Sequence, residues 1–336
     1  MTVDFENELL LITAASGKQS THLIPHVLKQ WKHIRLQVTS QSSKDRLEKQ
    51  YADHSSVEVV QADMTSQQDC HKLLEGVTAC FLITPGFNPH ETMAGYNIID
   101  AALAQPKGQF KHLLYSSVIH PILRKLINHD AKRYIEEYLV ESGLSYTIVQ
   151  PTVLMENLPI AKLINEDNPT HFSLWNPDTK FSFVSCRDVG EASANILAQR
   201  EKHSYATYQL IGTPSPLTHN DISSLVSDVI GKEVKLEQKL LEEGVKLFSN
   251  VLTHGESPED APFATTQGCA RMFMYYNEKG LLGNPNVLEM VLGKKPLGYE
   301  EWVKVNLEES KGGKGGRGDG GSDGGEIARS TATGLR

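Results

Sequence analysis

The first 150 residues alternate between short apolar runs and longer segments whose apolar positions recur at helical spacing. Short apolar runs bounded by turn residues indicate buried strands, and the segments between them indicate helices. Such an alternation predicts a parallel sheet covered by helices on both faces, a doubly wound α/β fold of the Rossmann type. The expected strands are Leu9–Thr13, Ile34–Val38, Val57–Gln61, Ala79–Thr84, His112–Ser117 and Tyr146–Val149.

The first expected helix carries a stripe of apolar side chains that is typical of a face packed on a sheet. The stripe consists of Leu23, Ile24, Val27, Leu28 and Trp31. Pro25 lies among them, and we expect it in the first turn of the helix, where its missing N–H costs little.

The alternation becomes less regular after residue 150. The pattern predicts strands at Phe181–Ser185 and Tyr208–Ile211, a helix that begins at Asp188, and a second helix over Asn220–Ile230. We therefore expect three parts: a dinucleotide-binding domain over 1–150, a smaller and mostly helical substrate lobe over 151–310 with segments that return to the first domain, and a glycine-rich tail over 311–336. The tail is too poor in apolar residues to order itself.

Composition excludes several classes of protein. The 336-residue chain has a net charge of -8 and no basic cluster, which argues against nucleic-acid binding. No apolar run is long enough to be a signal or membrane segment, so we expect a cytoplasmic protein without a membrane partner. The cysteines form no CxxC pair, which argues against a metal site and fits a reducing compartment. They are Cys70, Cys80, Cys186 and Cys269.

The strand Leu9–Thr13 leads into a turn of small residues and then into a helix. This order is typical of a dinucleotide-binding corner, which usually has three glycines. Here the three positions hold Ala14, Gly17 and Ser20, and the loop between them also offers Ser16, Lys18 and Gln19 to a pyrophosphate. The alternative is a strand–turn–helix corner that binds nothing.

The residues after the second strand indicate which nicotinamide dinucleotide fits. An acidic residue there would bind the ribose 2′-hydroxyl of NAD, whereas basic and hydroxyl groups favour the 2′-phosphate of NADP. The chain has no acid at this place. Ser40 and Ser43 offer hydroxyls and Lys18 or Lys44 offers charge, so the pattern favours NADP(H), with a plain polar turn as the alternative.

Two further strand ends belong to the same crevice, because ligands of open α/β sheets bind at the carboxyl ends of the strands. Asp63 and Met64 follow the third strand, where a carboxylate and a thioether can hold an adenine. Thr84 and Pro85 follow the fourth strand, on the adenosine side. A helix cap or an ordinary turn is the alternative at each place.

A helix over residues 128–139 carries the residues most suited to acid–base chemistry. His129, Lys132 and Glu136 share one helix face by their spacing. Lys132 would bind a ribose, His129 would transfer a proton near neutral pH, and Ser117 would hold a substrate oxygen. The alternative is a solvated charged face.

Several segments together resemble NmrA-like proteins, which are atypical members of the short-chain dehydrogenase/reductase superfamily. The resemblance covers about Leu9 to Leu307, and the segments around Ser16–Gln19 and Asn128–Lys132 are similar to the fungal branch. It implies that Lys132 contacts the nicotinamide ribose and that the turn from Gln150 and Pro151 to Asn157 lines the nicotinamide pocket. The segments that carry it are Ile12–Gly17, Val59–Met64, Tyr115–Val118, Lys132–Glu136, Tyr146–Asn157 and Phe183–Val189.

One departure from the superfamily leaves the function open. The usual catalytic tyrosine stands four residues before the lysine, where this chain has Asn128. The resemblance implies an NADPH-dependent reductase acting on a carbonyl, imine or enone of a small molecule, such as a secondary-metabolite intermediate. It also allows a non-catalytic NADP(H) sensor that binds a transcription factor, or a non-redox cyclase or isomerase in which His120 or His129 transfers the proton.

Overall fold

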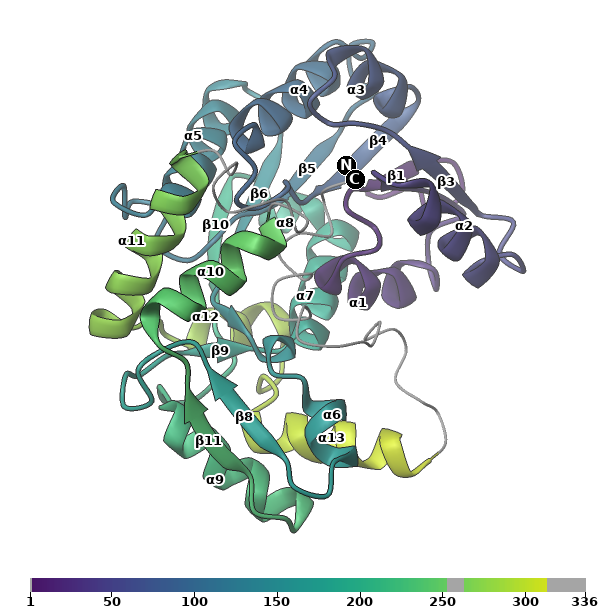
Figure 1. Ribbon diagram of the computed structural model, residues 1–336. Helices are drawn as coiled ribbons and strands as arrows, with labels where there is room; N and C mark the ends of the chain where they lie inside the picture. Colours follow the sequence, from purple (N-terminus) through teal and green to yellow (C-terminus); the bar gives the residue numbers. More distant parts are fainter. Residues whose placement is uncertain (1, 253–262, 313–336) are drawn as a thin grey trace. The chain divides into compact units, whose positions relative to one another are not determined.

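The computed structural model describes residues 2–252 and 263–312, which form two compact units (Figure 1). The first unit contains the chain up to Pro151 together with Val189–Gln209. The second contains Thr152–Asp188 and the described residues from Leu210 onward. The predicted glycine-rich tail lies outside the described residues from position 313 on.

A seven-stranded parallel sheet forms the centre of the first unit, in the order β10-β6-β5-β4-β1-β2-β3. β1 pairs with β2 on one side and with β4 on the other, so the strand order reverses beside β1, where ligands of this fold bind. The sheet confirms the predicted Rossmann-type fold class. Its strands are β1 (Leu9–Ile12), β2 (His33–Val38), β3 (Val57–Gln61), β4 (Val77–Leu82), β5 (His112–Ser116), β6 (Tyr146–Pro151) and β10 (Ala206–Leu210).

Helices follow the strands of this sheet along the chain. Residues of α3, α4 and α5 bury their apolar faces together with β4 and β5 in one core cluster that includes Cys80, Ile98 and Ile135. α1 and α7 approach closely, since a Cβ at Gly190 would lie 2.7 Å from the His22 carbonyl. The helices are α1 (Lys18–Val27), α2 (Gln41–Gln50), α3 (Gln67–Leu74), α4 (Glu91–Leu103), α5 (Ile127–Glu141), α7 (Cys186–Ala198) and α8 (Arg200–His203).

The prediction for Pro25 was wrong. Gly17 is the N-cap of α1, so the helix begins at Lys18 and Pro25 lies in its last turn. The missing N–H of Pro25 removes one backbone hydrogen bond of the helix, which ends two residues later at Val27. The apolar stripe itself is buried at Leu23, Ile24, Val27 and Trp31.

The second unit contains more strand than its sequence pattern predicts. β8 pairs with β11 and β7 pairs with β9, each pair parallel. The predicted strand over Phe181–Ser185 shortens to β9, and the predicted helix over Asn220–Ile230 is α9. The elements are β7 (Val153–Leu154), η1 (Met155–Asn157), α6 (Ile160–Asn165), β8 (Thr170–Ser173), β9 (Phe183–Val184), α9 (His219–Ile230), β11 (Lys235–Gln238), α10 (Leu241–Leu252), α11 (Phe263–Lys279), α12 (Asn286–Leu292) and α13 (Tyr299–Lys311).

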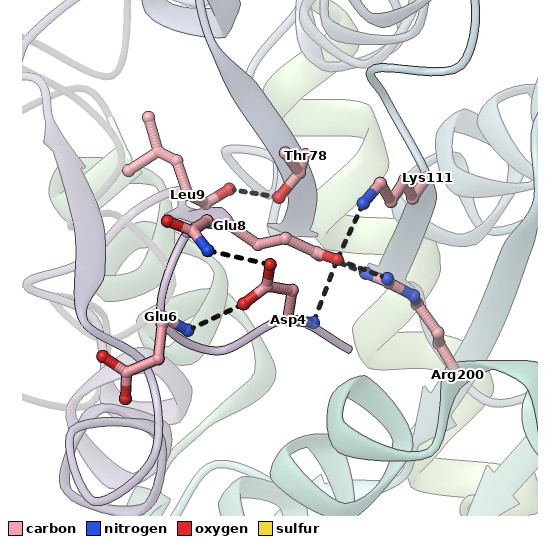
Figure 2. A network of polar contacts seen from close by, with 8 residues as sticks. Asp4, Glu6, Glu8, Leu9, Thr78, Lys111 and Arg200 are labelled. Carbon is pink, nitrogen blue, oxygen red and sulfur yellow. Dashed lines mark hydrogen bonds and ion pairs between the residues drawn. The ribbon is translucent and has the colours of Figure 1, made fainter. Parts of the chain in front are cut away.

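A buried ion-pair network joins the start of β1 to α8 within the first unit (Figure 2). Glu8, of which only 3% of the side chain is exposed, accepts hydrogen bonds from the Arg200 guanidinium at 2.5 and 2.7 Å. Lys111 Nζ lies 2.9 Å from the same carboxylate. Burial alone would raise the pKa of Glu8, but the hydrogen bonds from Arg200, Lys111 and the Asp4 backbone lower it to about 2.

Candidate functional site

Two buried polar side chains fix the ends of the strands next to the first turn. Ile83 N donates to Thr13 Oγ1 at 2.7 Å, which ties the end of β4 to the end of β1. Gln37 on β2 accepts from Ala14 N at 2.9 Å and donates to the Ala62 carbonyl at 2.8 Å. The turn after β1 is therefore rigidly held. Sequence reasoning missed Gln37, although a glutamine in an apolar strand was a usable signal.

Of the three predicted glycine positions, Ala14 and Gly17 lie in the turn between β1 and α1, and Ser20 lies in the first turn of α1. Ala14 has φ of 45°, in the left-handed region that favours glycine. Gly17 caps α1 without any side chain, and the hydroxyl of the fully buried Ser20 donates to the Thr13 carbonyl at 3.0 Å. Alanine and serine thus occupy glycine positions without disrupting the turn.

The N-terminus of α1 has the properties of an anion site. No side chain caps the helix and no acidic residue lies in its first turn, so its first N–H groups and the helix dipole face the loop. Lys18 and Ser16 are partly exposed there. Gln19 Oε1 accepts from Ser116 Oγ at 2.7 Å, which links this turn to the end of β5.

At the ends of β2 and β3 the structure shows a helix cap and a turn, which were the alternatives to cofactor contacts at these places. Ser40 caps α2 by accepting from Ser43 N at 3.2 Å, and its hydroxyl donates to Ser43 Oγ at 3.0 Å. Asp63 accepts from the backbone and hydroxyl of Thr65, both at 2.8 Å. The Met64 side chain is buried in the core cluster, which favours a packing role for its thioether.

The end of β4, the start of α4 and the middle of α5 place three polar groups together. Lys132 Nζ donates to Glu91 Oε1 at 2.6 Å and to Thr84 Oγ1 at 3.2 Å. Thr84 Oγ1 in turn donates to Glu91 Oε1 at 2.8 Å, which closes a triangle. Only 1% of the Glu91 side chain and 13% of the Lys132 side chain are exposed. The alternative of a solvated charged face therefore does not hold at Lys132.

Glu91 is the main residue that sequence reasoning missed. It opens α4, a helix of mostly small and apolar residues, seven positions after Thr84. Its position at a helix N-terminus favours the carboxylate charge. No local pattern indicates its partner, since 41 positions separate Glu91 from Lys132.

Two buried hydroxyl groups lie close to this triangle. Tyr115 Oη lies within reach of Thr84 and Ser117, and Ser117 lies within reach of Glu136, but within the described residues neither hydroxyl makes a hydrogen bond of good geometry. The Lys132 ammonium lies 6.0 Å from the centre of the Tyr115 ring. Burial raises the pKa of Glu136. Gln150 Nε2 donates to its two carboxylate oxygens at 2.9 and 3.2 Å. Buried hydroxyls without a hydrogen bond of good geometry are groups that a bound ligand would satisfy.

His129 has a different environment from the one that the sequence suggested. Its ring is fully buried, and Nδ1 lies 3.1 Å from the His120 carbonyl oxygen, to which it donates. Burial lowers the pKa of His129 to about 4. The ring is therefore neutral near pH 7, which argues against the proton transfer predicted for it.

Pro85 and Pro151, two further predicted site residues, are both buried in the first unit.

Comparisons with known proteins identify the family. The model of the NmrA-like family matches residues 6–308, which is most of the chain. The chain belongs to the NmrA-like family. The match confirms the family resemblance of the sequence motifs. A curated relative of this NmrA-like protein, "Prestalk A differentiation protein A" from Dictyostelium discoideum, is 20% identical over 90% of the chain and 94% of its own length.

Solved structures with the same fold include both a regulator and an enzyme. NmrA, a negative transcriptional regulator solved in complex with NADP, has a TM-score of 0.69 at 17% identity and covers 93% of this chain and 98% of its own. The NADPH-dependent quinone oxidoreductase QOR2 from Escherichia coli, complexed with NADPH, has a TM-score of 0.67 at 21% identity and covers 88% and 99%. At these identities the likeness of the NmrA-like protein to both shows the fold alone.

The described part of this NmrA-like protein also lacks two kinds of feature. None of its helices has the length and apolar character required to cross a membrane. Its histidine, cysteine and carboxylate side chains form no group of three placed to hold a metal ion.

Proposed function

We propose that this NmrA-like protein binds NADP(H) at the carboxyl ends of the first unit's strands and reduces a carbonyl, imine or enone of a small molecule. The observation that carries the proposal is the buried triangle of Lys132, Glu91 and Thr84 beside the buried hydroxyls of Tyr115 and Ser117, neither of which makes a hydrogen bond of good geometry in the described part of the chain. A buried ammonium next to hydroxyls that lack a well-formed hydrogen bond is an arrangement that a ribose and a substrate oxygen would complete. A secondary-metabolite substrate and an origin in the fungal branch belong to the same proposal.

The residues of the turn after β1 fit a dinucleotide for two reasons. No side chain caps the N-terminus of α1, and Ala14 in the loop before it has a left-handed backbone. The pyrophosphate would bind at this helix end, with Ser40 toward the 2′-phosphate and Lys132 toward the nicotinamide ribose. We also propose that the dinucleotide contacts the remaining predicted site residues, which are Ser16, Lys18, Gln19, Asp63, Met64, Thr84, Pro85 and Pro151.

The bound cofactor would supply a hydride to the substrate. Ser117 would donate a hydrogen bond to the substrate oxygen and hold it in place. Since His129 is buried and neutral, we assign the proton to a water molecule rather than to this ring.

Calorimetric and thermal-shift titrations with NADPH, NADP+, NADH and NAD+ test the binding. A ligand at a hundred times its dissociation constant raises the stability by about 2.7 kcal/mol. We expect tight binding of the two phosphorylated forms, NADPH oxidation with a member of a carbonyl, imine and enone panel, and a loss of turnover in Lys132→Ala. Turnover unchanged in Lys132→Ala would overturn the proposed role.

A sensor function is the second candidate, and Asn128 favours it. This residue stands where the superfamily's catalytic tyrosine is expected, and the similarly folded NmrA is a transcriptional regulator. A sensor would bind the oxidised and reduced cofactors with different affinities, consume no NADPH on any panel member, and bind a protein partner.

A further inference from the structure

Glu91 stands out because it is a carboxylate buried in an apolar helix face, and the function proposed above assigns it no contact with the cofactor or the substrate. Both of its hydrogen bonds reach one oxygen, Oε1, from the ammonium of Lys132 and the hydroxyl of Thr84. Burying a charge is unfavourable unless it is paired and hydrogen-bonded, and this pair meets both conditions.

The packing of two helices brings Glu91 to Lys132. One turn after Glu91 lies Gly95, and a Cβ at this glycine would be 2.7 Å from the Ile135 side chain on α5. Ile135 is one turn after Lys132, so the same close contact between α4 and α5 places the carboxylate beside the ammonium. Thr92 Oγ1 adds a hydrogen bond to the Ala131 carbonyl at 3.3 Å.

The pair carries no net charge, although Lys132 alone would make this end of the site positive. An oxidised nicotinamide ring is positively charged and a reduced ring is neutral. A positive charge that is not balanced would therefore weaken the binding of the oxidised form and leave the reduced form largely unaffected.

We propose that Glu91 is a positioning residue that holds Lys132 against Thr84 and that its negative charge sets the preference of the site between NADP+ and NADPH. The inference rests on the proposed function, since it assumes that Lys132 binds next to the nicotinamide. Lys132 contacts the ribose of both forms alike, so the ratio of the two dissociation constants isolates the effect of charge at Glu91.

The test measures the dissociation constants of NADP+ and NADPH by calorimetry for the wild type and for Glu91→Gln, which keeps the oxygen acceptor and removes the charge. We expect NADP+ to bind about tenfold more weakly and NADPH to change by less than about threefold. Glu137→Gln is the control, because its carboxylate lies on α5 with 56% of the side chain exposed. This control should keep the wild-type ratio.

Two further variants extend the test in case Glu91→Gln alone does not fold. Lys132→Gln leaves Glu91 unbalanced and should shift the ratio toward NADP+, and the double variant Glu91→Gln with Lys132→Gln should return it toward the wild-type value. An unchanged ratio in Glu91→Gln, or in the double variant relative to Lys132→Gln, would overturn this inference alone. A wild-type protein that binds none of the four dinucleotides would overturn the proposed function and this inference together.

Discussion

The Glu8 carboxylate accepts two hydrogen bonds from the guanidinium of Arg200, a residue 192 positions later in the chain. Both side chains are almost completely buried. Removal of Arg200 takes two charge-assisted hydrogen bonds from a buried carboxylate and leaves Lys111 to balance its charge, which is far more destabilising than the loss of a surface pair.

Arg200→Ala should lower the free energy of unfolding by about 3–5 kcal/mol. Lys304→Ala is the control, because its exposed pair with Glu300 should contribute less than about 1 kcal/mol. Urea denaturation monitored by circular dichroism measures both. Equal stabilities of the two variants would contradict the prediction.

The low pKa of the Glu8 carboxyl predicts that the free energy of unfolding depends on pH. The pKa of Glu8 is about 2 in the folded protein against an ordinary value of 4.5, so its contribution is complete above about pH 4.5 and is lost as the pH falls toward 2. The stability difference between the wild type and Glu8→Gln should therefore shrink over this window. A difference that stays constant from pH 6 to pH 3 would exclude the assigned role.

Ala14→Gly should raise the free energy of unfolding by about 0.5–1 kcal/mol, because it relieves a left-handed backbone that an alanine adopts at a cost. Ala15→Gly is a matched control in the same turn. Ala15 is fully buried and is not among the positive-φ residues, so its replacement should lower the stability by about 1 kcal/mol. Thermal unfolding distinguishes them, and a decrease in both would refute the strain argument.

Ser40→Asp should weaken NADPH binding at least about tenfold and improve NADH binding, because a carboxylate repels a 2′-phosphate and accepts from a ribose hydroxyl. Aspartate is also a good N-cap, so α2 should remain stable. Ser40→Asn keeps the cap without the charge and should keep the preference for NADPH. Calorimetric titrations compare the variants, and an unchanged preference in Ser40→Asp would remove Ser40 from the proposed site.

Ser116 and Ser117 are adjacent and buried, but among the residues that the structure describes only the hydroxyl of Ser116 makes a hydrogen bond of good geometry, to Gln19. Ser116→Ala should lower the stability of the unliganded protein by about 1 kcal/mol, while Ser117→Ala should leave it unchanged or raise it slightly. Turnover on the identified substrate should fall in Ser117→Ala. A destabilised Ser117→Ala with full turnover would show that the hydroxyl serves the fold rather than the substrate.

Most strands of the first unit were predictable because they contain a local apolar run. β3 has the bounds predicted for it, Val57–Gln61, and β4 begins two residues before the expected Ala79. The two-stranded sheets of the second unit were not predictable in this way. β11 is largely exposed and lacks an apolar run, since it forms by pairing with β8.

The candidate site was predictable only where a motif is local. The corner at Ala14, Gly17 and Ser20 follows from the order of strand, turn and helix, whereas the pairing of Glu91 with Lys132 depends on how α4 packs on α5. The burial of His129 is equally a product of the fold, because helix spacing places it on a face but does not show what covers it. The functional roles of these residues remain predictions.

The pairing of Glu8 with Arg200 also bears on the order of synthesis and folding. The first unit is made from two stretches of chain, separated by Thr152–Asp188 of the second unit. A nascent chain that ends before Arg200 contains six of the seven sheet strands, yet it lacks β10 and leaves the Glu8 carboxylate without its guanidinium partner. The first unit therefore reaches its final state on the ribosome only after part of the second unit has been synthesised.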